Sequence, residues 1–197
     1  MSRLPERGGA SVTQLASALR AIDAANSADP DRSEGRPAAL LYGERMSAEL
    51  ARLCPDASDE LQIAVRGQHI ERWTSPRSGY PEGREGYLAW RRDLGAFHAR
   101  RVGEIMAGAG YGADTIARAG AMLRKEGIKR DAEVQALEDA ACFTFLRWYF
   151  QPFATGRDSA EIERIVAKTA RKMSVAARAR ALEDFDLPPE LAGAFRA

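Results

Sequence analysis

The chain has 197 residues, 45% of them hydrophobic and 29% charged, and its formal net charge is +1 at pH 7. These values are ordinary for a globular protein, and the near-balance of charge argues against binding to nucleic acid or to an anionic membrane. No apolar run resembles a signal peptide or approaches the roughly 18 apolar residues of a membrane span. The two cysteines form no Cys-x-x-Cys pair, so we expect no disulfide framework and a cytoplasmic, bacterial-type protein.

The predicted elements are all helices. Residues 1–10 are rich in charge, proline and glycine and are expected to be disordered. Two prolines and two glycines make 74–84 a loop, and no strand pattern is present. The sequence therefore predicts an all-α fold, a bundle of seven to eight helices with no sheet, in a single domain over residues 11–197. Periodicity and capping residues place the helices near 12–26, 37–53, 59–72, 85–108, 113–125, 131–150, 158–173 and 174–184, with a short one near 188–195.

Three polar side chains lie on the apolar stripes of separate predicted helices. His69 follows Val65 by four residues, and His98 comes one turn after Leu94. Asp139 lies in the helix near 131–150, where an unpartnered buried carboxylate would cost several kcal/mol. Two histidines and a carboxylate can converge on a divalent metal that supplies a hydroxide nucleophile. The ordinary alternatives are hydrogen-bonded core histidines and an aspartate that accepts from a helix N-terminus or an arginine.

A second set of candidates combines cationic and aromatic side chains. Arginine offers bidentate hydrogen bonds to phosphate, and aromatic rings can stack on a planar ligand. Arg72 and Arg77 flank the loop after His69, which favours a role in binding, although a solvated ion pair is the alternative for any single arginine. The pattern therefore predicts a small anionic or phosphorylated ligand as the partner. The candidates for binding it are Arg45, Arg72, Trp73, Arg77, Tyr80, Arg91 and Lys125.

Several segments spread over the chain resemble the family called domain of unknown function 4202. The likeness covers roughly residues 12–195, and it implies no known activity. It rests on 40–46 (LLYGERM), 68–73 (QHIERW), 76–77 (PR), 80–81 (YP), 87–91 (YLAWR), 97–99 (FHA), 123–125 (LRK) and 137–141 (LEDAA).

More remotely, the chain resembles the HD-domain metal phosphohydrolases. Those enzymes use a His on one helix, a His-Asp pair on the next and a late Asp, with extra histidines between them in some branches. The resemblance implies an HD-like bundle in which His69 matches the His of the pair. It also implies that His98 is an additional ligand and that Asp139 is the final Asp.

The chain departs from the HD pattern at three positions. The first-helix His falls on Tyr42 if the apolar stripe fixes the register, or on Glu44 if only a metal ligand is sought. The Asp expected after His69 is Ile70, and Glu71 comes one residue later. In a helix that extra residue turns the carboxylate by roughly 100°. The third departure is at the second additional His, which is expected near Arg124 or Lys125, where cations would repel a metal. Together these departures favour a reduced metal site, or none.

Three hypotheses about function follow. The first is a divergent hydrolase of a small phosphorylated molecule such as a nucleotide. It would use one divalent ion (Mn, Fe, Mg, Ni or Zn) held by His69, His98, Asp139 and Glu44. His69 and Glu71 would be the catalytic residues, with Glu71 acting as general base or as a further ligand. The second is a metal-free HD-like domain that binds an anionic ligand in the same cavity and has a regulatory or scaffolding role. The third is an interaction module with a vestigial cavity. The sequence leaves the oligomeric state open, a homodimer included.

Overall fold

The computed structural model describes residues 9–196, with side chains from residue 14 onward. The predicted disorder of 1–10 therefore falls largely outside the described residues, although Gly9 and Ala10 already belong to the first helix. Between residues 9 and 196 no helix is long and apolar enough to cross a membrane.

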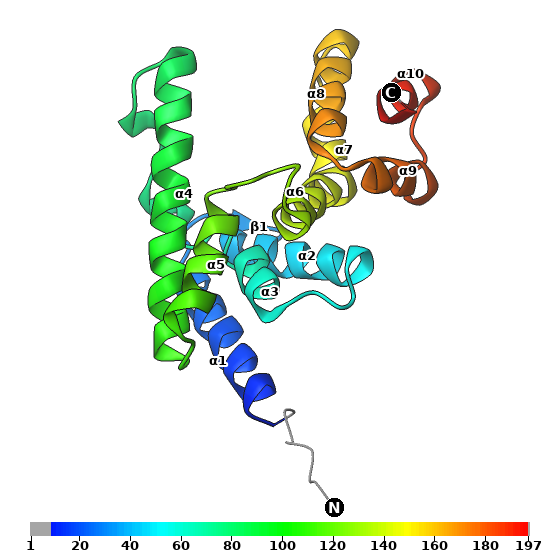
Figure 1. Cartoon of the computed structure of the whole chain (residues 1–197). Helices are drawn as coiled ribbons and strands as arrows, with labels where there is room; N and C mark the ends of the chain where they lie inside the picture. The colour runs from blue at the N-terminus through cyan, green and yellow to red at the C-terminus, as the bar shows by residue number, and fades with distance from the viewer. Residues whose placement is uncertain (1–8, 197) are drawn as a thin grey trace, which may run out of the picture. The chain divides into compact units, whose positions relative to one another are not determined.

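Helices dominate the described residues, as predicted (Figure 1). The ten α-helical segments exceed the predicted seven to eight, partly because a π-helical turn at Phe145–Tyr149 divides the helix expected over 131–150. The segments are α1 (Gly9–Asn26), α2 (Ala38–Leu53), α3 (Asp59–Arg66), α4 (Gly83–Gly108), α5 (Ala113–Leu123), α6 (Ala132–Thr144), α7 (Phe150–Ala154), α8 (Ser159–Lys172), α9 (Val175–Asp184) and α10 (Pro189–Arg196).

The prediction that the chain has no sheet was wrong, because the structure contains one small two-stranded sheet. Two-residue strands, β1 (Arg32–Ser33) and β2 (Arg36–Pro37), pair antiparallel. Glu34 and Gly35 between them both have positive φ, 53° and 76°, which is the requirement of a tight type I′ hairpin turn. Strands this short leave no periodic hydrophobic pattern, so the all-α class stands.

The helices form two compact units. The first comprises residues 1–44 and 58–126, and the second comprises 45–57 and 127–197. Helix α2 begins in the first unit and continues into the second. The single domain expected over 11–197 stays a prediction, and each unit is described by itself below.

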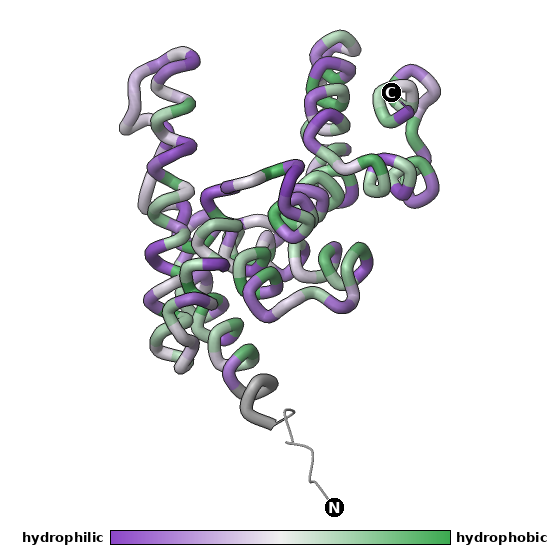
Figure 2. Tube along the Cα trace, viewed as in Figure 1, coloured by the Kyte–Doolittle hydropathy of each residue, from purple (hydrophilic) through white to green (hydrophobic). Residues whose placement is uncertain are grey.

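In the first unit, α5 packs along the much longer α4, and both α3 and α1 pack against this pair (Figure 1). Polar and apolar residues alternate along α4 in Figure 2, as expected of a helix with one buried face. Fully buried side chains from four helices meet in the core: Ile22, Leu61, Val102 and Met122. This packing holds α4 and the end of α5 in fixed positions.

Helix α3 ends earlier than the predicted 59–72. Gly67 is its C-cap, and a Cβ at this position would lie 2.5 Å from Cγ2 of Val102. The close approach of α4 therefore requires glycine, and the chain turns here instead of continuing as a helix. His69 consequently lies in a turn, where Ile70 N–H donates to Gly67 O (3.0 Å) and Arg72 N–H donates to His69 O (3.2 Å).

In the second unit, the apolar core is built from α6 to α10, with Phe143, Val166, Ala181 and Phe195 among its buried members.

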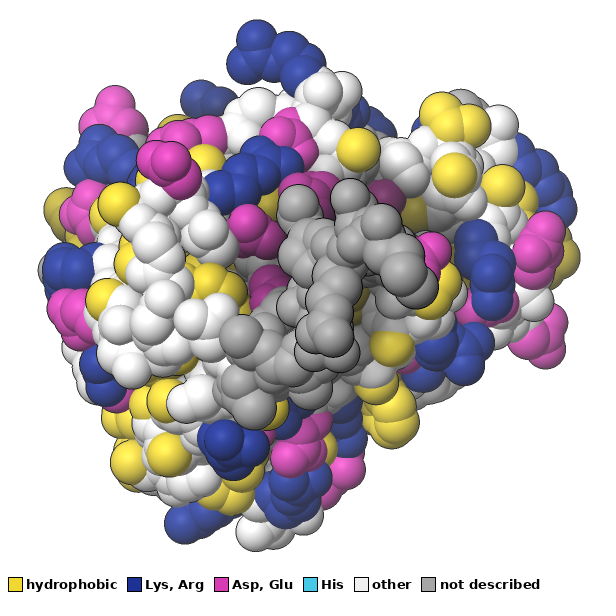
Figure 3. Space-filling view, turned by 60° about the horizontal axis from the view of Figure 1, so that its bottom comes forward, with side chains coloured by type: hydrophobic (Ala, Val, Ile, Leu, Met, Phe, Trp, Pro, Cys, Tyr) yellow, Lys and Arg dark blue, Asp and Glu magenta, His cyan; other side chains and the backbone are white. Residues whose placement is uncertain are grey.

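Figure 3 views the molecule from another direction and shows Lys and Arg side chains interspersed with Asp and Glu over the described part of that face. This mixture agrees with the small net charge of the chain.

Candidate functional site

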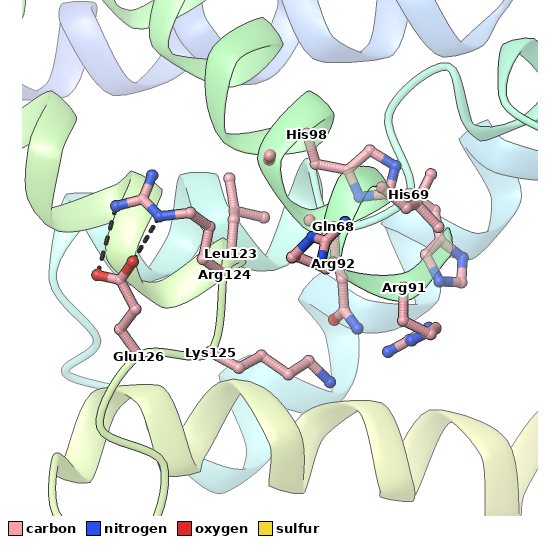
Figure 4. A pocket seen from close by; sticks show the side chains of 12 residues that line it. Gln68, His69, Arg91, Arg92, His98, Leu123, Arg124, Lys125 and Glu126 are labelled. Carbon is pink, nitrogen blue, oxygen red and sulfur yellow. Dashed lines mark hydrogen bonds and ion pairs between the residues drawn. The ribbon is translucent and has the colours of Figure 1, made fainter. Parts of the chain in front are cut away.

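A cavity of about 430 Å³ lies in the first unit (Figure 4). Its volume falls within the roughly 300–1,000 Å³ of small-molecule sites. Three segments supply its wall: the turn after α3, the middle of α4 and the end of α5 with the residues that follow it. The lining residues are Gln68, His69, Arg91, Arg92, Leu94, Gly95, Ala96, His98, Leu123, Arg124, Lys125 and Glu126.

The two histidines, distant in sequence, meet at this cavity with ring centroids 6.3 Å apart. His98 comes from the inward face of α4 and is 4% exposed. Its Nε2 atom is buried and has no hydrogen-bond partner among the atoms described. His69 is partly buried and stacks on the ring of Tyr42. The structure thus brings together two of the predicted site residues.

Both imidazoles are neutral near pH 7. Burial lowers the pKa of His98 to about 3, with a further contribution from Arg72 and Arg91. Burial likewise holds the pKa of His69 well below its usual value, and the charges of Arg72, Arg91 and Lys125 act in the same direction. A histidine pair surrounded by cations resists protonation, because a further positive charge would be desolvated and repelled.

Positive charge predominates in the lining of the cavity. Its cationic side chains are Arg91, Arg92, Arg124 and Lys125, and Glu126 is the one carboxylate among the lining residues. Glu126 is engaged by Arg124, whose Nε lies 2.7 Å from Oε1 (Figure 4). The carboxylate is therefore already neutralised and does not balance Arg91, whereas Arg92 is paired with Asp93 at 3.1 Å.

Two arginines near the histidines have no acidic partner in the part of the chain that the structure describes. Arg91 lines the cavity, and no hydrogen bond or ion pair engages its side chain there. Arg72, half-buried, places its guanidinium 5.2 Å from the ring centre of Trp90. Burial and the nearby charge of Arg91 lower the pKa of Arg72. These like charges are held close together, so an anion between them would be stabilised.

The backbone at the end of α5 places Lys125 in a conformation that usually requires glycine. Lys125 has φ of 59°. Its N–H donates to Met122 O (2.9 Å), and the N–H of Glu126 donates to Ala121 O (3.0 Å). This pair of bonds is a Schellman motif, in which the left-handed position is usually glycine. A lysine there costs roughly 1–2 kcal/mol, and its side chain extends toward Gln68 and Arg91 (Figure 4).

The chain matches the family described as domain of unknown function (DUF4202) over residues 16–194. It belongs to the DUF4202 family. This confirms the family resemblance read from the sequence, whereas the HD-like arrangement stays a prediction. No curated protein and no solved structure matches the chain. The family description names no activity, so the function of this DUF4202 chain has to be argued from its site.

The two acidic residues among the predicted metal ligands are engaged elsewhere. Glu44 forms an ion pair with Arg36, with Oε2 lying 2.7 Å from Nη1. Asp139 belongs to the second unit, where its carboxylate accepts from Ser174 N–H (2.8 Å) and Ser174 Oγ (2.7 Å) at the start of α9. No three His, Cys, Asp or Glu side chains gather into a possible metal site within the described ranges. Two imidazoles supply fewer than the three or four protein ligands that zinc usually takes, and the surrounding arginines would repel a divalent cation, so this pair does not fit a metal.

Glu71, predicted as general base or metal ligand, holds the turn of this DUF4202 chain in place. It has φ of 48°, and its N–H donates to Asn26 Oδ1 (3.0 Å). Its carboxylate accepts two hydrogen bonds from Arg101, at 2.8 and 3.2 Å. Glu71 does not line the cavity.

The predicted ligand-binding residues divide into two groups. Arg91 and Lys125 line the cavity, and the charge of Arg72 acts on both histidines. The remaining four residues are placed elsewhere. Arg77 donates to the carbonyl oxygens of Tyr80 (2.9 Å) and Pro81 (2.8 Å) and thereby closes its own loop. Tyr80 hydrogen-bonds Asp93, Trp73 is partly exposed in the 3₁₀ turn Arg72–Thr74, and Arg45 lies over Trp148 in the second unit.

Gln68 lines the cavity but was not among the site residues predicted from the sequence. In a continuous helix Gln68 would point roughly 100° away from His69. Because the helix ends at Gly67, Gln68 and His69 instead lie together in the turn and both line the cavity. The available signal was Gly67 itself, a glycine directly before two polar side chains.

Proposed function

We propose that this DUF4202 protein binds a small anionic ligand, with a phosphate group as the anionic part, in the cavity beside His69 and His98. The observation that carries the proposal is that Arg91 lines the cavity with no acidic partner among the described residues, while Glu126, the one lining carboxylate, is already paired with Arg124. We place the phosphate near Arg91 and Lys125, with Arg72 behind the histidines. This is the metal-free alternative expected from the sequence, with a regulatory or scaffolding role.

The charge of a phosphate suits this cavity better than the charge of a singly charged anion. A phosphate monoester carries about 1.5–2 negative charges near pH 7 and offers three acceptor oxygens. Arginine binds such a group through paired hydrogen bonds, and partial burial strengthens each of them. The repulsion between Arg72 and Arg91, which lowers the pKa of Arg72, would be relieved by the bound anion.

A charge-matched pair of variants tests the proposal. Arg91→Gln removes a guanidinium from the cavity, whereas Arg100→Gln removes one from an exposed position on α4, where it lies over Phe97 at 5.5 Å. We expect phosphate monoesters to bind the wild type and Arg100→Gln with similar affinity, and Arg91→Gln about tenfold more weakly. Isothermal titration calorimetry with methyl phosphate measures this. Equal affinity in all three proteins would refute the proposal.

Metal content distinguishes the proposed metal-free binding protein from the phosphohydrolase alternative. The proposal predicts that protein purified without a His-tag contains far less than one equivalent of metal. It also predicts no phosphatase activity after addition of Mn²⁺, Fe²⁺, Mg²⁺, Ni²⁺ or Zn²⁺. One tightly held equivalent of metal, lost together with activity in His69→Ala and His98→Ala, would favour the hydrolase instead.

A further inference from the structure

Two polar groups at the cavity are not explained by binding to a phosphate alone. Oε1 of Gln68 is buried and has no hydrogen-bond partner among the atoms described, and the same holds for Nε2 of His98. Both residues line the cavity, and His98 is 4% exposed. Leaving a buried acceptor without a donor costs roughly 1–3 kcal/mol. A ligand in the cavity that supplied the missing hydrogen bonds would remove this cost.

The chemistry of Gln68 restricts what the ligand offers. An amide oxygen only accepts hydrogen bonds, and a phosphate dianion carries no proton to donate. In the proposed complex Arg91 and Lys125, which are donors, are engaged by the phosphate and do not serve this oxygen. The group that faces Gln68 must therefore be a donor, such as a hydroxyl. A neutral imidazole has one donor and one acceptor nitrogen, and either can pair with a hydroxyl, which donates and accepts.

The size and arrangement of the cavity agree with this requirement. Its volume of about 430 Å³ greatly exceeds that of a phosphate group, since a single water takes about 30 Å³ of liquid. The Lys125 side chain extends toward Gln68 and Arg91 (Figure 4). Cationic groups and the unpartnered amide therefore lie within reach of one small molecule.

From these observations we infer that the ligand is a hydroxylated phosphate monoester of about the size of a pentose phosphate. Its phosphate binds Arg91 and Lys125, and one of its hydroxyls donates to Oε1 of Gln68, with another beside His98. The inference rests on the proposed function, because it specifies what accompanies the phosphate in the same cavity.

The experiment compares ligands that differ in one feature. Ribose 5-phosphate has both the phosphate and the hydroxyls, methyl phosphate has only the phosphate, and ribose has only the hydroxyls. By calorimetry, we expect ribose 5-phosphate to bind about tenfold more tightly than methyl phosphate, the contribution of one to two hydrogen bonds. Ribose alone is expected to bind too weakly to detect.

A variant of Gln68 assigns the gain to that residue. Gln68→Leu keeps a similar volume but has no acceptor, so its preference for ribose 5-phosphate over methyl phosphate should fall from about tenfold to about threefold or less. Retention of the tenfold preference in a folded Gln68→Leu overturns the inference. If the variant does not fold, the wild type is titrated with tetrahydrofurfuryl phosphate, which has the ring and the phosphate of ribose 5-phosphate but none of its ring hydroxyls. An affinity equal to that for ribose 5-phosphate then overturns the inference.

Different results overturn the proposed function and the hydroxyl requirement. Equal binding of methyl phosphate and ribose 5-phosphate to the wild type overturns the hydroxyl requirement and leaves anion binding intact. Absence of binding by every phosphate compound overturns the proposed function and, with it, the inference. Binding of ribose as tight as that of ribose 5-phosphate also overturns both.

Discussion

The ring of Tyr42 lies on the imidazole of His69, with ring centroids 3.9 Å apart and planes inclined by 15°. If the apolar stripe of α2 fixes the register, Tyr42 occupies the position of the first-helix His of the HD pattern. Glu44, the alternative chosen for its ligand chemistry, forms an ion pair with Arg36 instead. Of these two positions of α2, it is Tyr42, on the apolar stripe, whose ring contacts His69.

The stack leads to a prediction about the pKa of His69. Tyr42 shields one face of the imidazole, and burial is the largest cause of the lowered pKa of His69. Tyr42→Ala should therefore raise that pKa toward about 6.5, the usual value. Tyr42→Phe retains the stack and should leave it lowered. An NMR titration of the two histidines down to pH 5 measures this, with His98 as the internal reference. A silent His69 in Tyr42→Ala would contradict the prediction.

The neutral histidines also predict how stability depends on pH. Their pKa values are lowered in the folded state, so below about 6.5 the unfolded chain binds protons that the native protein does not. The free energy of unfolding should therefore fall as pH decreases, by about 1.4 kcal/mol per histidine between pH 7.5 and 5.5. Because the chain has two histidines and carboxylates titrate mainly at lower pH, this window isolates them.

His98→Gln provides the check on that assignment. The variant removes one of the two titrating groups, so the loss of stability between pH 7.5 and 5.5 should be about half that of the wild type. Urea denaturation at several pH values measures the change. A slope equal to that of the wild type would show that His98 does not remain neutral in the fold.

The left-handed conformation of Lys125 separates its role in binding from its role in stability. Lys125→Gly removes the strain of φ at 59°, and this gain is offset in part by the greater freedom of glycine in the unfolded chain. We expect unchanged or slightly increased stability, by up to about 1 kcal/mol, together with at least tenfold weaker binding of phosphate monoesters. Thermal denaturation and calorimetry measure the two effects.

Lys129→Gly is the matched control for that variant. Lys129 also has a positive φ, 68°, but it belongs to the second unit, where its Nζ donates to Arg171 O at 3.0 Å. The same backbone relief is expected there with no loss of phosphate affinity. Equal weakening by both substitutions would attribute the effect to total charge and not to Lys125.

Sequence periodicity located most helices because their limits are set by local chemistry. Ser58 caps α3 and Asp131 caps α6, each through its own side chain, and such caps are visible in the sequence. The end of α3 was missed because the close approach of Val102 to Gly67 is a tertiary contact. For the same reason the pairing of His69 with His98 could be suggested but not established from spacing.

The partners of the carboxylates were harder to predict from the sequence than the positions of the helices. Glu71 and Arg101 are 30 positions apart, and no local pattern connects them. Similarly, Asp139 could be read as a metal ligand or as an acceptor at a helix N-terminus, and only packing decides between the two. Ionic partners depend on how helices come together, and helix propensity carries no information on that.

The pairing of Glu71 with Arg101 predicts a structural effect of its removal. Glu71→Gln should lower the free energy of unfolding by about 1 kcal/mol or less, since the pair is partly exposed. Binding of phosphate monoesters should be unchanged, because Glu71 does not line the cavity. Chemical denaturation and calorimetry check the two statements. A large loss of an enzymatic activity in a folded Glu71→Gln would instead support the general base predicted from the sequence.

Asp139 is expected to stabilise the second unit by holding Ser174, the N-cap residue of α9, in place. It is 7% exposed, and its Oδ1 also accepts from Gln135 Nε2 at 2.9 Å. Asp139→Ala leaves these donors without an acceptor, so we expect a loss of about 2–3 kcal/mol in the free energy of unfolding. Ser174→Ala should cost about 1 kcal/mol. In a double-mutant cycle by urea denaturation the two losses should be clearly non-additive, because the residues share hydrogen bonds. Additive losses would contradict this role of Asp139.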